Sequence, residues 1–377
     1  MRILFFSHYG SLYGANRSLL ALLIQLKKKN IDLHVIARVT GSFVDQLDKH
    51  CIPYTVIYFQ DSVHCSKKKQ DKSPFNKKNN VLKLLRNIKI FPRIYRVVQT
   101  FHPDVIHSNS SVINIGFWTS SLFRIPHVWH VREFMDLDYN LIPDFGFAIF
   151  NRQLNHSESV IYVSESLAEH FNHAGKRAEV IYNGVLSNGE TTIVKKKGTK
   201  TFRLGIIGLI NKNKGHFEVV DALAGIREQL DRHNIQLNIF GQGDEEALTE
   251  YAQQNGVNSY LCFKGFYDSI LDIYKECDGV IVASRNEAMG RVTAEAMLTG
   301  TPVIGYDNAG TGELIEHGKT GLLYQTSEEL GSHIIQLASD EGLRKTLTEQ
   351  ALDFGKQHFT TEVYAEKVLD VFEDVIE

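Results

Sequence analysis

Hydrophobic and polar positions alternate along the chain in a pattern that predicts short strands separated by helices. Short apolar or β-branched runs bounded by polar turns are typical of strands. Leu19–Lys29 has the apolar spacing of an amphipathic helix. In the first half, the strand candidates are Arg2–Ser7, Asp32–Ala37, Tyr54–Ile57, Val105–His107, His127–Trp129, Ser159–Val163 and Val180–Tyr182.

The alternation stops at a polar, glycine-containing stretch, residues 187–200, and then begins again. That stretch is typical of a linker between domains. Short apolar strands separated by helices favour parallel sheets covered on both faces. The strand candidates of the second half are Phe202–Ile207, Gln236–Phe240, Leu261–Phe263, Gly279–Val282 and Pro302–Gly305.

The fold class is therefore α/β, with two Rossmann-like, doubly wound parallel-sheet domains. We expect an N-terminal domain over residues 1–186 and a C-terminal domain over 201–360. Two such domains side by side would face each other across a cleft at the carboxyl ends of their strands. The amphipathic segment 361–377 has room to pack in several places, including back across the first domain.

The composition is that of a globular protein, with 43% hydrophobic and 23% charged residues. The apolar run at the start is too short for a signal peptide, and no segment approaches the roughly 18 apolar residues of a membrane span. The four cysteines have no metal-ligand spacing and are expected to be reduced. These features predict a cytoplasmic protein.

The net charge of −3 hides an asymmetry. Residues 65–96 hold eleven Lys or Arg and one acid, Asp71, so this segment carries +10 and the rest of the chain −13. Two interpretations stay open: a patch that attracts an anionic membrane surface, and a solvated insertion. Nucleic acid is not an expected partner, because no recognition motif accompanies the charge.

Several glycine turns follow predicted strands. Gly14 lies in a turn before the first helix, Gly208 opens a loop that ends at Lys214, and Gly241 belongs to a Gly-x-Gly turn. Glycine lets the backbone approach a ligand closely, although each turn alone is a weak signal. None of these turns has the Gly-x-Gly-x-x-Gly spacing of a dinucleotide site.

The most informative stretch is Ser284–Met297, in which Glu287 and Glu295 are separated by seven residues. A glycine turn and then a run of helix formers predict a strand, a loop and a helix N-terminus. Free backbone N–H groups and the positive end of the helix dipole suit a diphosphate there, and the carboxylates suit sugar hydroxyls. The alternative is a pair of solvated glutamates at a helix start.

Taken together, the turns resemble glycosyltransferase family 4 in their order and spacing. The segments Ile181–Gly184, Gly310–Glu313 and Gly318–Leu323 match as well, and the Glu-x7-Glu stretch is the signature of retaining members. The resemblance implies the GT-B fold, with the nucleotide sugar held mainly by the C-terminal domain and the acceptor by the N-terminal one.

The resemblance also implies roles for individual residues. Glu295 would bind both ribose hydroxyls, Glu287 the donor sugar, and Lys214 the diphosphate together with backbone N–H groups. His130 matches a histidine near the reacting sugar, and we assign His107 a structural role. The other donor-binding positions are Gly14, Gly208, Gly241, Met289, Gly290, Arg291 and Val292.

One position departs from the family pattern. Leu209 stands directly after Gly208, where the family usually has an arginine that pairs with the diphosphate. Arg291 and Arg17 are candidates to supply that charge. The pair Asp136 and Asp138 resembles the metal-holding Asp-x-Asp of another glycosyltransferase fold, but we interpret it as chance and expect no metal.

The resemblance implies a retaining, metal-independent glycosyltransferase that needs no cofactor. It would move a sugar from a nucleotide-diphosphate sugar, a UDP-sugar being favoured, to a hydroxyl of a glycan or lipid-linked acceptor. Surface polysaccharide assembly at the inner face of the cell membrane is the expected setting. Two alternatives stay open: a nucleotide-sugar epimerase of similar fold, and a non-catalytic glycan-binding protein.

Overall fold

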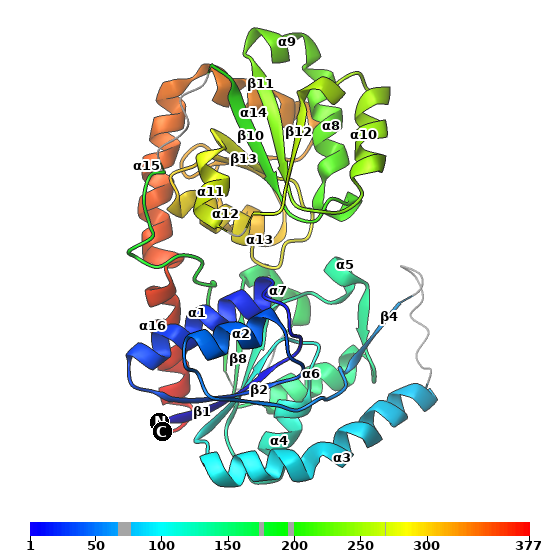
Figure 1. The fold of residues 1–377 in the computed structure, drawn as a ribbon, viewed down its shortest axis with the longest axis vertical. Coiled ribbons are helices and arrows are strands. Elements are labelled where there is room, and N and C mark those ends of the chain that lie inside the picture. The colour runs from blue at the N-terminus through cyan, green and yellow to red at the C-terminus, as the bar shows by residue number, and fades with distance from the viewer. Residues whose placement is uncertain (67–76, 173–176, 195–199, 268) are drawn as a thin grey trace. The chain divides into compact units, whose positions relative to one another are not determined.

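The computed structural model describes residues 1–66, 77–172, 177–194, 200–267 and 269–377. The chain forms two compact units (Figure 1). Unit 1 contains Met1–Gly184 and Thr361–Glu377, and unit 2 contains Val185–Thr360. The basic residues Lys67, Lys68, Lys69 and Lys72, and positions 195–199 of the expected linker, lie outside the described residues.

Unit 1 is built on a seven-stranded parallel sheet with the order β3-β2-β1-β5-β6-β8-β9. The chain moves from β1 outward to β3 and then returns to β5 on the other side of β1, which is a doubly wound topology. The strands are β1 (Arg2–Ser7), β2 (Asp32–Ala37), β3 (Tyr54–Val56), β5 (Val105–Asn109), β6 (His127–Val131), β8 (Ser159–Tyr162) and β9 (Ala178–Val180).

Helices cover both faces of this sheet (Figure 1). A short antiparallel pair, β4 (Val63–Cys65) and β7 (Leu141–Pro143), stands apart from it. The helices of unit 1 are α1 (Gly14–Lys28), α2 (Ser42–Lys49), α3 (Lys77–Phe101), α4 (Ile115–Phe123), α5 (Asp136–Tyr139), α6 (Phe147–His156), α7 (Glu165–Phe171) and α16 (Thr361–Asp374).

The last helix belongs to the core of unit 1. Tyr364, Val368 and Phe372 of α16 are buried in the same cluster as Phe5 of β1 and Leu19 of α1. Their spacing of four residues places them on one face of the helix. Residues more than 340 positions apart in sequence therefore stabilise one domain together.

Unit 2 repeats the same winding with six parallel strands in the order β12-β11-β10-β13-β14-β15. Leu204 and Ile206 of its central strand pack in a core shared with helices on one face of the sheet. The strands are β10 (Phe202–Ile207), β11 (Ile235–Phe240), β12 (Leu261–Gly265), β13 (Gly279–Val282), β14 (Val303–Tyr306) and β15 (Leu322–Tyr324).

The helices of unit 2 vary widely in length, from single 3₁₀ turns to the 18 residues of α15. They are η1 (Lys212–Lys214), α8 (His216–Gly225), α9 (Arg227–Arg232), α10 (Glu245–Gln254), η2 (Asn258–Tyr260), α11 (Ile270–Lys275), α12 (Arg291–Leu298), α13 (Ala309–Leu314), α14 (Ser327–Ser339) and α15 (Glu341–His358).

The expected pair of Rossmann-like domains is confirmed, whereas some strand bounds are wrong. The strand expected at Val180–Tyr182 is Ala178–Val180, because its neighbour β8 ends at Tyr162, opposite Val180. The three-residue strands β4, β7 and β15 were missed, since so short a run shows no alternation. In the described residues no helix combines the length and apolar character needed to cross a bilayer.

Candidate functional site

In unit 2, two glycine turns meet backbone to backbone where β10 and β11 end. Gly241 has φ +145°, and a Cβ at this position would lie 1.9 Å from the carbonyl oxygen of Gly208. The Gly208 N–H donates to the Phe240 carbonyl at 2.9 Å. A side chain at position 241 would push the turns apart, so glycine is required there to bring the two loops together.

Lys214 lies at the end of the loop that Gly208 opens. The Asn211 side chain caps this turn by accepting from the Lys214 N–H at 2.9 Å. The Lys214 Nζ is 2.5 Å from Oε1 of Glu287, so the cation and the first predicted carboxylate are in direct contact. Burial would raise the pKa of Glu287, but the Lys214 ammonium and hydrogen bonds from Lys214 and Ser284 hold it below its usual value.

Glu287 precedes the N-terminus of α12. The N-cap is Gly290, with φ +85° and no side chain that caps the helix. The Gly310 N–H donates to the Glu287 carbonyl at 2.9 Å, and a Cβ on Gly310 would lie 2.6 Å from Cα of Met289. The loop is thus held tightly, and the positive end of the helix dipole favours an anion beside it.

Glu295 is buried one turn inside α12. Its Oε1 accepts from Nη2 of Arg291 at 3.3 Å, and its Oε2 accepts from the hydroxyl of Tyr274 at 3.4 Å. Burial and the neighbouring Glu295 carboxylate raise the pKa of Tyr274 well above its usual value. Tyr274 is a contact that the sequence did not indicate, because it lies 21 residues away on α11.

Leu209 stands where the family usually has an arginine that pairs with the diphosphate, and Arg291 and Arg17 are the candidates to supply that charge. The Leu209 side chain is 59% exposed. Arg291 forms an ion pair with Glu295, and Arg17 of unit 1 donates from Nε to the Leu12 carbonyl at 3.1 Å. The supply of charge by Arg291 or Arg17 stays a prediction.

In unit 1, His130 is wholly buried near the end of β6. Its Nδ1 is 3.3 Å from Nη2 of Arg132 and 3.3 Å from Nε2 of His107. A guanidinium can only donate, so Nδ1 accepts and the proton of the neutral ring is on Nε2. Burial and the nearby Arg132 and His107 lower the pKa of His130 well below its usual value. His130 is therefore a neutral ring that presents an Nε2–H.

Arg132 ties several elements of unit 1 together. Its Nε donates to Oδ1 of Asn109 at 2.7 Å, Nη2 donates to the Tyr364 hydroxyl at 2.8 Å, and Nη1 donates to Oδ1 of Asn183. The end of β5, the end of β6 and α16 are thus joined through one guanidinium. The sequence prediction did not use Arg132 and Glu133. Two charged residues directly after an apolar strand were a signal that could have indicated their role.

The neighbouring carboxylate serves the loop after β5. Glu133 accepts from the Ser110 hydroxyl and from the Ser111 N–H, the latter at 2.9 Å. Burial raises the pKa of Glu133, although these hydrogen bonds and Arg132 act in the opposite direction. Glu133 therefore holds the β5 loop beside His130.

The loop after β1 is fixed by a buried side chain. Oδ1 of Asn16 accepts from the Ser7 hydroxyl at 2.8 Å, and Nδ2 donates to the Tyr9 and Ser11 carbonyls at 2.7 and 2.9 Å. A Cβ on Gly14, the first residue of α1, would meet nothing within 4 Å. Packing does not require glycine there, so the ligand role of Gly14 stays a prediction.

Asp136 and Asp138 have partners within unit 1. Asp138 Oδ2 accepts from the Phe134 N–H at 3.0 Å, and Asp136 Oδ1 is 3.0 Å from Nε2 of His170. Burial and the Glu133 charge raise the pKa of Asp138 to about 7. Across the described ranges, no group of three or more His, Cys, Asp and Glu is arranged to hold a metal ion.

Comparison with known proteins decides the family. The glycosyltransferase family 4 profile matches residues 13–186, and the profile of glycosyl transferases group 1 matches residues 190–354. The chain belongs to glycosyltransferase family 4. The GT-B expectation is confirmed by solved structures of that fold.

One such structure is Anabaena Alr3699/HepE in complex with UDP and glucose. It shares 24% identity with this family 4 chain, covers 99% of both chains and superposes with a TM-score of 0.78. An uncharacterised glycosyltransferase of Methanocaldococcus jannaschii is 27% identical over 78% of this chain and 83% of its own length. The alpha-monoglucosyldiacylglycerol synthase of Streptococcus pneumoniae is 24% identical over 73% and 68%.

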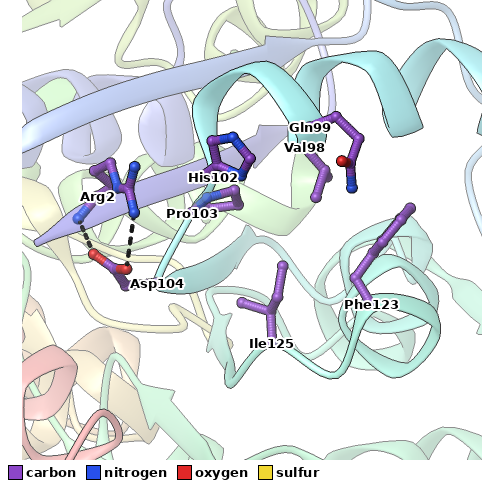
Figure 2. A pocket seen from close by; sticks show the side chains of 8 residues that line it. All are labelled: Arg2, Val98, Gln99, His102, Pro103, Asp104, Phe123 and Ile125. Atoms are coloured by element: carbon purple, nitrogen blue, oxygen red, sulfur yellow. Dashed lines mark hydrogen bonds and ion pairs between the residues drawn. The ribbon is translucent and has the colours of Figure 1, made fainter.

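None of the predicted site residues of this glycosyltransferase lines either of two hollows. One, of about 290 Å³, is at the starts of β1, β5 and β6, where Arg2 pairs with Asp104 (Figure 2). The other, of about 540 Å³, is lined in part by Lys212 and Arg285 of unit 2. Ligands of doubly wound sheets bind at the opposite, carboxyl ends of the strands, so we assign the first hollow no part in catalysis.

Proposed function

We propose that the chain is a retaining glycosyltransferase that moves a sugar from a UDP-sugar to a hydroxyl of a glycan or lipid-linked acceptor. The observation that carries the proposal is the grouping in unit 2 of Lys214, Glu287 and Glu295 around the N-terminus of α12. The UDP bound by the structurally similar Anabaena protein supports uracil as the base.

The donor would be bound by charge and by fixed hydrogen-bond donors. The diphosphate would lie at the N-terminus of α12, where Lys214 neutralises charge as the leaving group departs. Releasing Glu287 from Lys214 would turn its carboxylate toward the donor sugar. Glu295 would accept from both ribose hydroxyls, which requires it to exchange its contact with Arg291 or Tyr274 for the ligand.

The acceptor domain would contribute His130 as a hydrogen-bond donor. A neutral imidazole with its proton on Nε2 can donate to a sugar hydroxyl and carries no charge that would repel a developing oxocarbenium ion. The acceptor hydroxyl would attack from the face of the leaving phosphate, which takes its proton. Such a reaction needs neither a paired carboxylate nucleophile nor, in this proposal, a metal or cofactor.

We place the activity in surface polysaccharide assembly, in the cytoplasm at the inner face of the cell membrane. The sequence similarity to a synthase whose name includes diacylglycerol supports an acceptor carried by a lipid.

A thermal-shift panel tests the donor site. UDP-, GDP-, ADP- and dTDP-sugars are added without metal to the wild type, to Glu295→Gln and to the exposed control Glu316→Gln. A ligand at about 100 times its Kd stabilises by roughly 2.7 kcal/mol. We expect UDP-sugars to shift the wild type and the control but not Glu295→Gln, and a panel without any shift would overturn the proposal.

Product analysis separates transfer from the alternatives. NMR of the product should show a glycoside with the anomeric configuration of the donor, formed only when acceptor is present and unaffected by EDTA. A new nucleotide sugar formed without acceptor would instead identify an epimerase. Donor binding that is insensitive to Glu295→Gln and gives no product would favour a non-catalytic protein.

A further inference from the structure

Helix α3 of unit 1 exposes apolar side chains in a regular row. Val81, Leu85, Ile88, Pro92 and Tyr95 follow one another at intervals of four and three residues, which places them on one side of a helix. The side chains of Val81, Leu85, Ile88 and Tyr95 are 46, 48, 52 and 51% exposed, and Pro92 is exposed as well. We call these five residues the apolar stripe.

A row of cations runs next to the apolar stripe. Arg86, Lys89, Arg93 and Arg96 recur at intervals of three and four residues and are all exposed. At 100° per residue this basic stripe lies about a quarter turn around the helix from the apolar one. The sequence of α3 contains no acidic residue, and Arg93 also donates from Nη2 to the Val56 carbonyl at 3.0 Å. The outer side of the helix therefore combines apolar contact area with positive charge.

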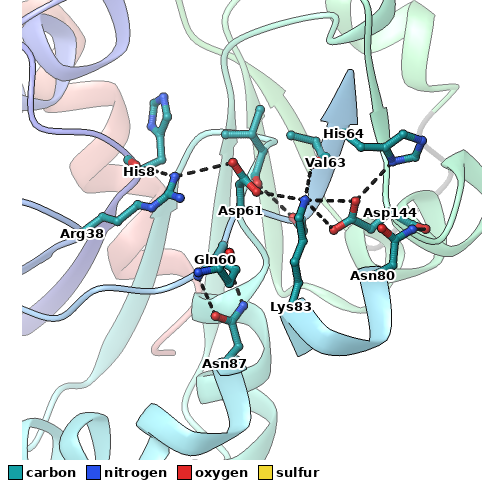
Figure 3. A network of polar contacts seen from close by, with 12 residues as sticks. His8, Arg38, Gln60, Asp61, Val63, His64, Asn80, Lys83, Asn87 and Asp144 are labelled. Carbon is teal, nitrogen blue, oxygen red and sulfur yellow. Dashed lines mark hydrogen bonds and ion pairs between the residues drawn. The ribbon is translucent and has the colours of Figure 1, made fainter. Parts of the chain in front are cut away.

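The inner side of the same helix is polar in its N-terminal half (Figure 3). Lys83 Nζ donates to the Val63 carbonyl at 2.6 Å and lies 3.2 Å from Oδ2 of the buried Asp144 and 3.0 Å from Oδ1 of Asp61. The Asn80 side chain donates to the Asp144 carbonyl at 2.6 Å.

Asn87 continues this polar inner side. It accepts from the Gln60 N–H at 2.7 Å and donates to the Gln60 carbonyl at 3.1 Å. A surface helix in water has the reverse arrangement, with its apolar side toward the protein. In this half of α3 polar side chains hold the helix to the domain while leucine, isoleucine and valine face outward, so water is not the environment that the outer side suits.

The apolar area extends onto α4. The rings of Tyr95 and Phe123 are 5.9 Å apart, which joins the end of the stripe to the C-terminal end of α4. On α4, Trp118 and Leu122 are one turn apart and are 40 and 62% exposed. Several large apolar side chains on two neighbouring helices make a continuous patch of the kind that marks an interaction site.

We propose that α3 and the adjoining part of α4 lie on the surface of a bilayer that contains anionic lipid. A helix with an apolar row and a flanking row of Lys and Arg binds in the plane of such a surface, with its apolar side chains inserted at the level of the headgroups. Each cation near an anionic surface strengthens binding about fivefold. A second copy of the chain fits less well, because pairing the stripes would bring two all-basic rows together.

This inference rests on the proposed function only for its purpose, which is to hold the enzyme where a lipid-linked acceptor resides. The surface would bind lipid whether or not the chain transfers a sugar. Binding can therefore be measured without substrate, and UDP binding by the same variants reports on the donor site separately.

Vesicle co-sedimentation tests the surface directly. Full-length protein is mixed with vesicles of phosphatidylcholine alone and with vesicles that contain 30% phosphatidylglycerol. We expect binding to the anionic vesicles that weakens as the salt concentration rises. An unbound wild type, or equal binding to both kinds of vesicle at low and high salt, would overturn the proposal.

Paired variants separate the contributions of the two stripes. Lys89→Gln with Arg96→Gln removes two cations and should weaken binding roughly 30-fold, and Leu85→Gln with Ile88→Gln should weaken it at least about tenfold. The matched controls are Lys345→Gln with Lys356→Gln on α15 and Ile149→Gln on α6, all exposed residues. The controls should bind vesicles as the wild type does.

The same variants decide between a membrane and a second copy. All the substituted residues are exposed, so the variants should keep the wild-type melting temperature and UDP binding. Vesicle binding unchanged in both α3 pairs would overturn the proposal. So would a wild-type dimer, measured by light scattering, that Leu85→Gln with Ile88→Gln converts to a monomer.

Discussion

The two units share one topology but place their chemistry differently at the ends of their strands. In unit 2 the strand ends run into glycine turns, and the predicted groups are loop residues such as Lys214 and Glu287, which are in part exposed. In unit 1 the corresponding positions hold three buried side chains, His130, Arg132 and Glu133. Arg132 donates to His130, and Glu133 accepts from the loop after β5.

The difference shows two ways in which one fold can prepare a reaction. Unit 2 offers backbone N–H groups and the partly exposed ammonium of Lys214, which suit a charged ligand that enters and leaves. Unit 1 fixes which ring nitrogen of His130 carries the proton, because the Arg132 guanidinium can donate a hydrogen bond but cannot accept one. The arrangement in unit 2 is suited to binding a charged donor, and the arrangement in unit 1 is suited to positioning the reacting sugar.

The largest expected effect is a difference in acid sensitivity. His107, His127 and His130 are buried in unit 1, and burial lowers the pKa of each, that of His127 to about 3. In unit 2 burial lowers the pKa of His216 to about 4. The unfolded imidazoles take up protons below about pH 6.5 and the folded ones do not, so stability is lost as the pH falls.

Between pH 7.5 and 5.5 each imidazole that stays neutral in the folded state costs about 1.4 kcal/mol of stability, so unit 1, which also holds His8 with its pKa lowered to about 3, should lose more stability than unit 2. Asp138 offsets part of the loss in unit 1, because its pKa of about 7 lets the folded state take up a proton in this range. Hydrogen exchange at pH 7.5 and 5.5, corrected for the intrinsic rates, measures each unit separately. His127→Asn should lessen the pH dependence of unit 1 alone. Equal loss of stability in both units would contradict the expectation that unit 1 is the more acid-sensitive of the two.

The next effect concerns the Lys214 ammonium of unit 2. Lys214→Gln keeps a polar, unbranched side chain but removes the charge that would neutralise the leaving diphosphate, so turnover should fall about 10²- to 10³-fold. Lys212→Gln, two residues earlier in the same turn, is the matched control and should retain activity. Steady-state kinetics with a UDP-sugar provide the measurement, and similar rates for both variants would remove Lys214 from the site.

A smaller effect is expected at Arg132. Arg132→Gln deprives Asn109 and Tyr364 of a donor in a buried place, which should destabilise unit 1 by about 2–3 kcal/mol. It also leaves Nδ1 of His130 with His107 alone and removes a nearby positive charge, so the remaining turnover should change its pH profile, whereas UDP binding should stay as in the wild type. A variant that loses stability but keeps the wild-type profile would show that Arg132 has a structural role only.

The smallest effect is expected at Gly14. Gly14→Ala has room for its Cβ and lies at a helix start, so the protein should gain up to about 0.5 kcal/mol of stability. If a ligand approaches the backbone here, turnover should nevertheless decrease. Denaturant unfolding and activity are measured on the same variant, and unchanged turnover would remove Gly14 from the predicted donor-binding positions.

The sequence predicted the fold and the loops of unit 2 well, because those features are local. Alternation of apolar runs marks strands, and the turns at Gly208 and Gly241 and the Glu-x7-Glu spacing are read within a few residues. The contact of Tyr274 with Glu295 was out of reach, since the two residues lie on different helices. The same holds for Arg132, whose partners come from β5, the Asn183 segment and α16.

The basic charge of residues 65–96 was read from the sequence, but the orientation of α3 was not. The sequence mixes apolar and basic positions, and nothing in their order says which side faces the domain. Asp144, Asp61 and Gln60 decide it, because they offer polar partners to Asn80, Lys83 and Asn87 from segments distant along the chain. The long-range contacts of polar residues are what a single sequence conveys least.

Titration of UDP into three forms of the protein tests the central claim, that unit 2 binds the donor and unit 1 positions the reacting sugar. Calorimetry is performed on the wild type, Glu295→Gln and His130→Gln, with turnover measured on the same samples. We predict that Glu295→Gln loses UDP affinity, whereas His130→Gln binds UDP as the wild type does but has little turnover. Full UDP affinity in Glu295→Gln, or loss of UDP binding in His130→Gln, would contradict the account.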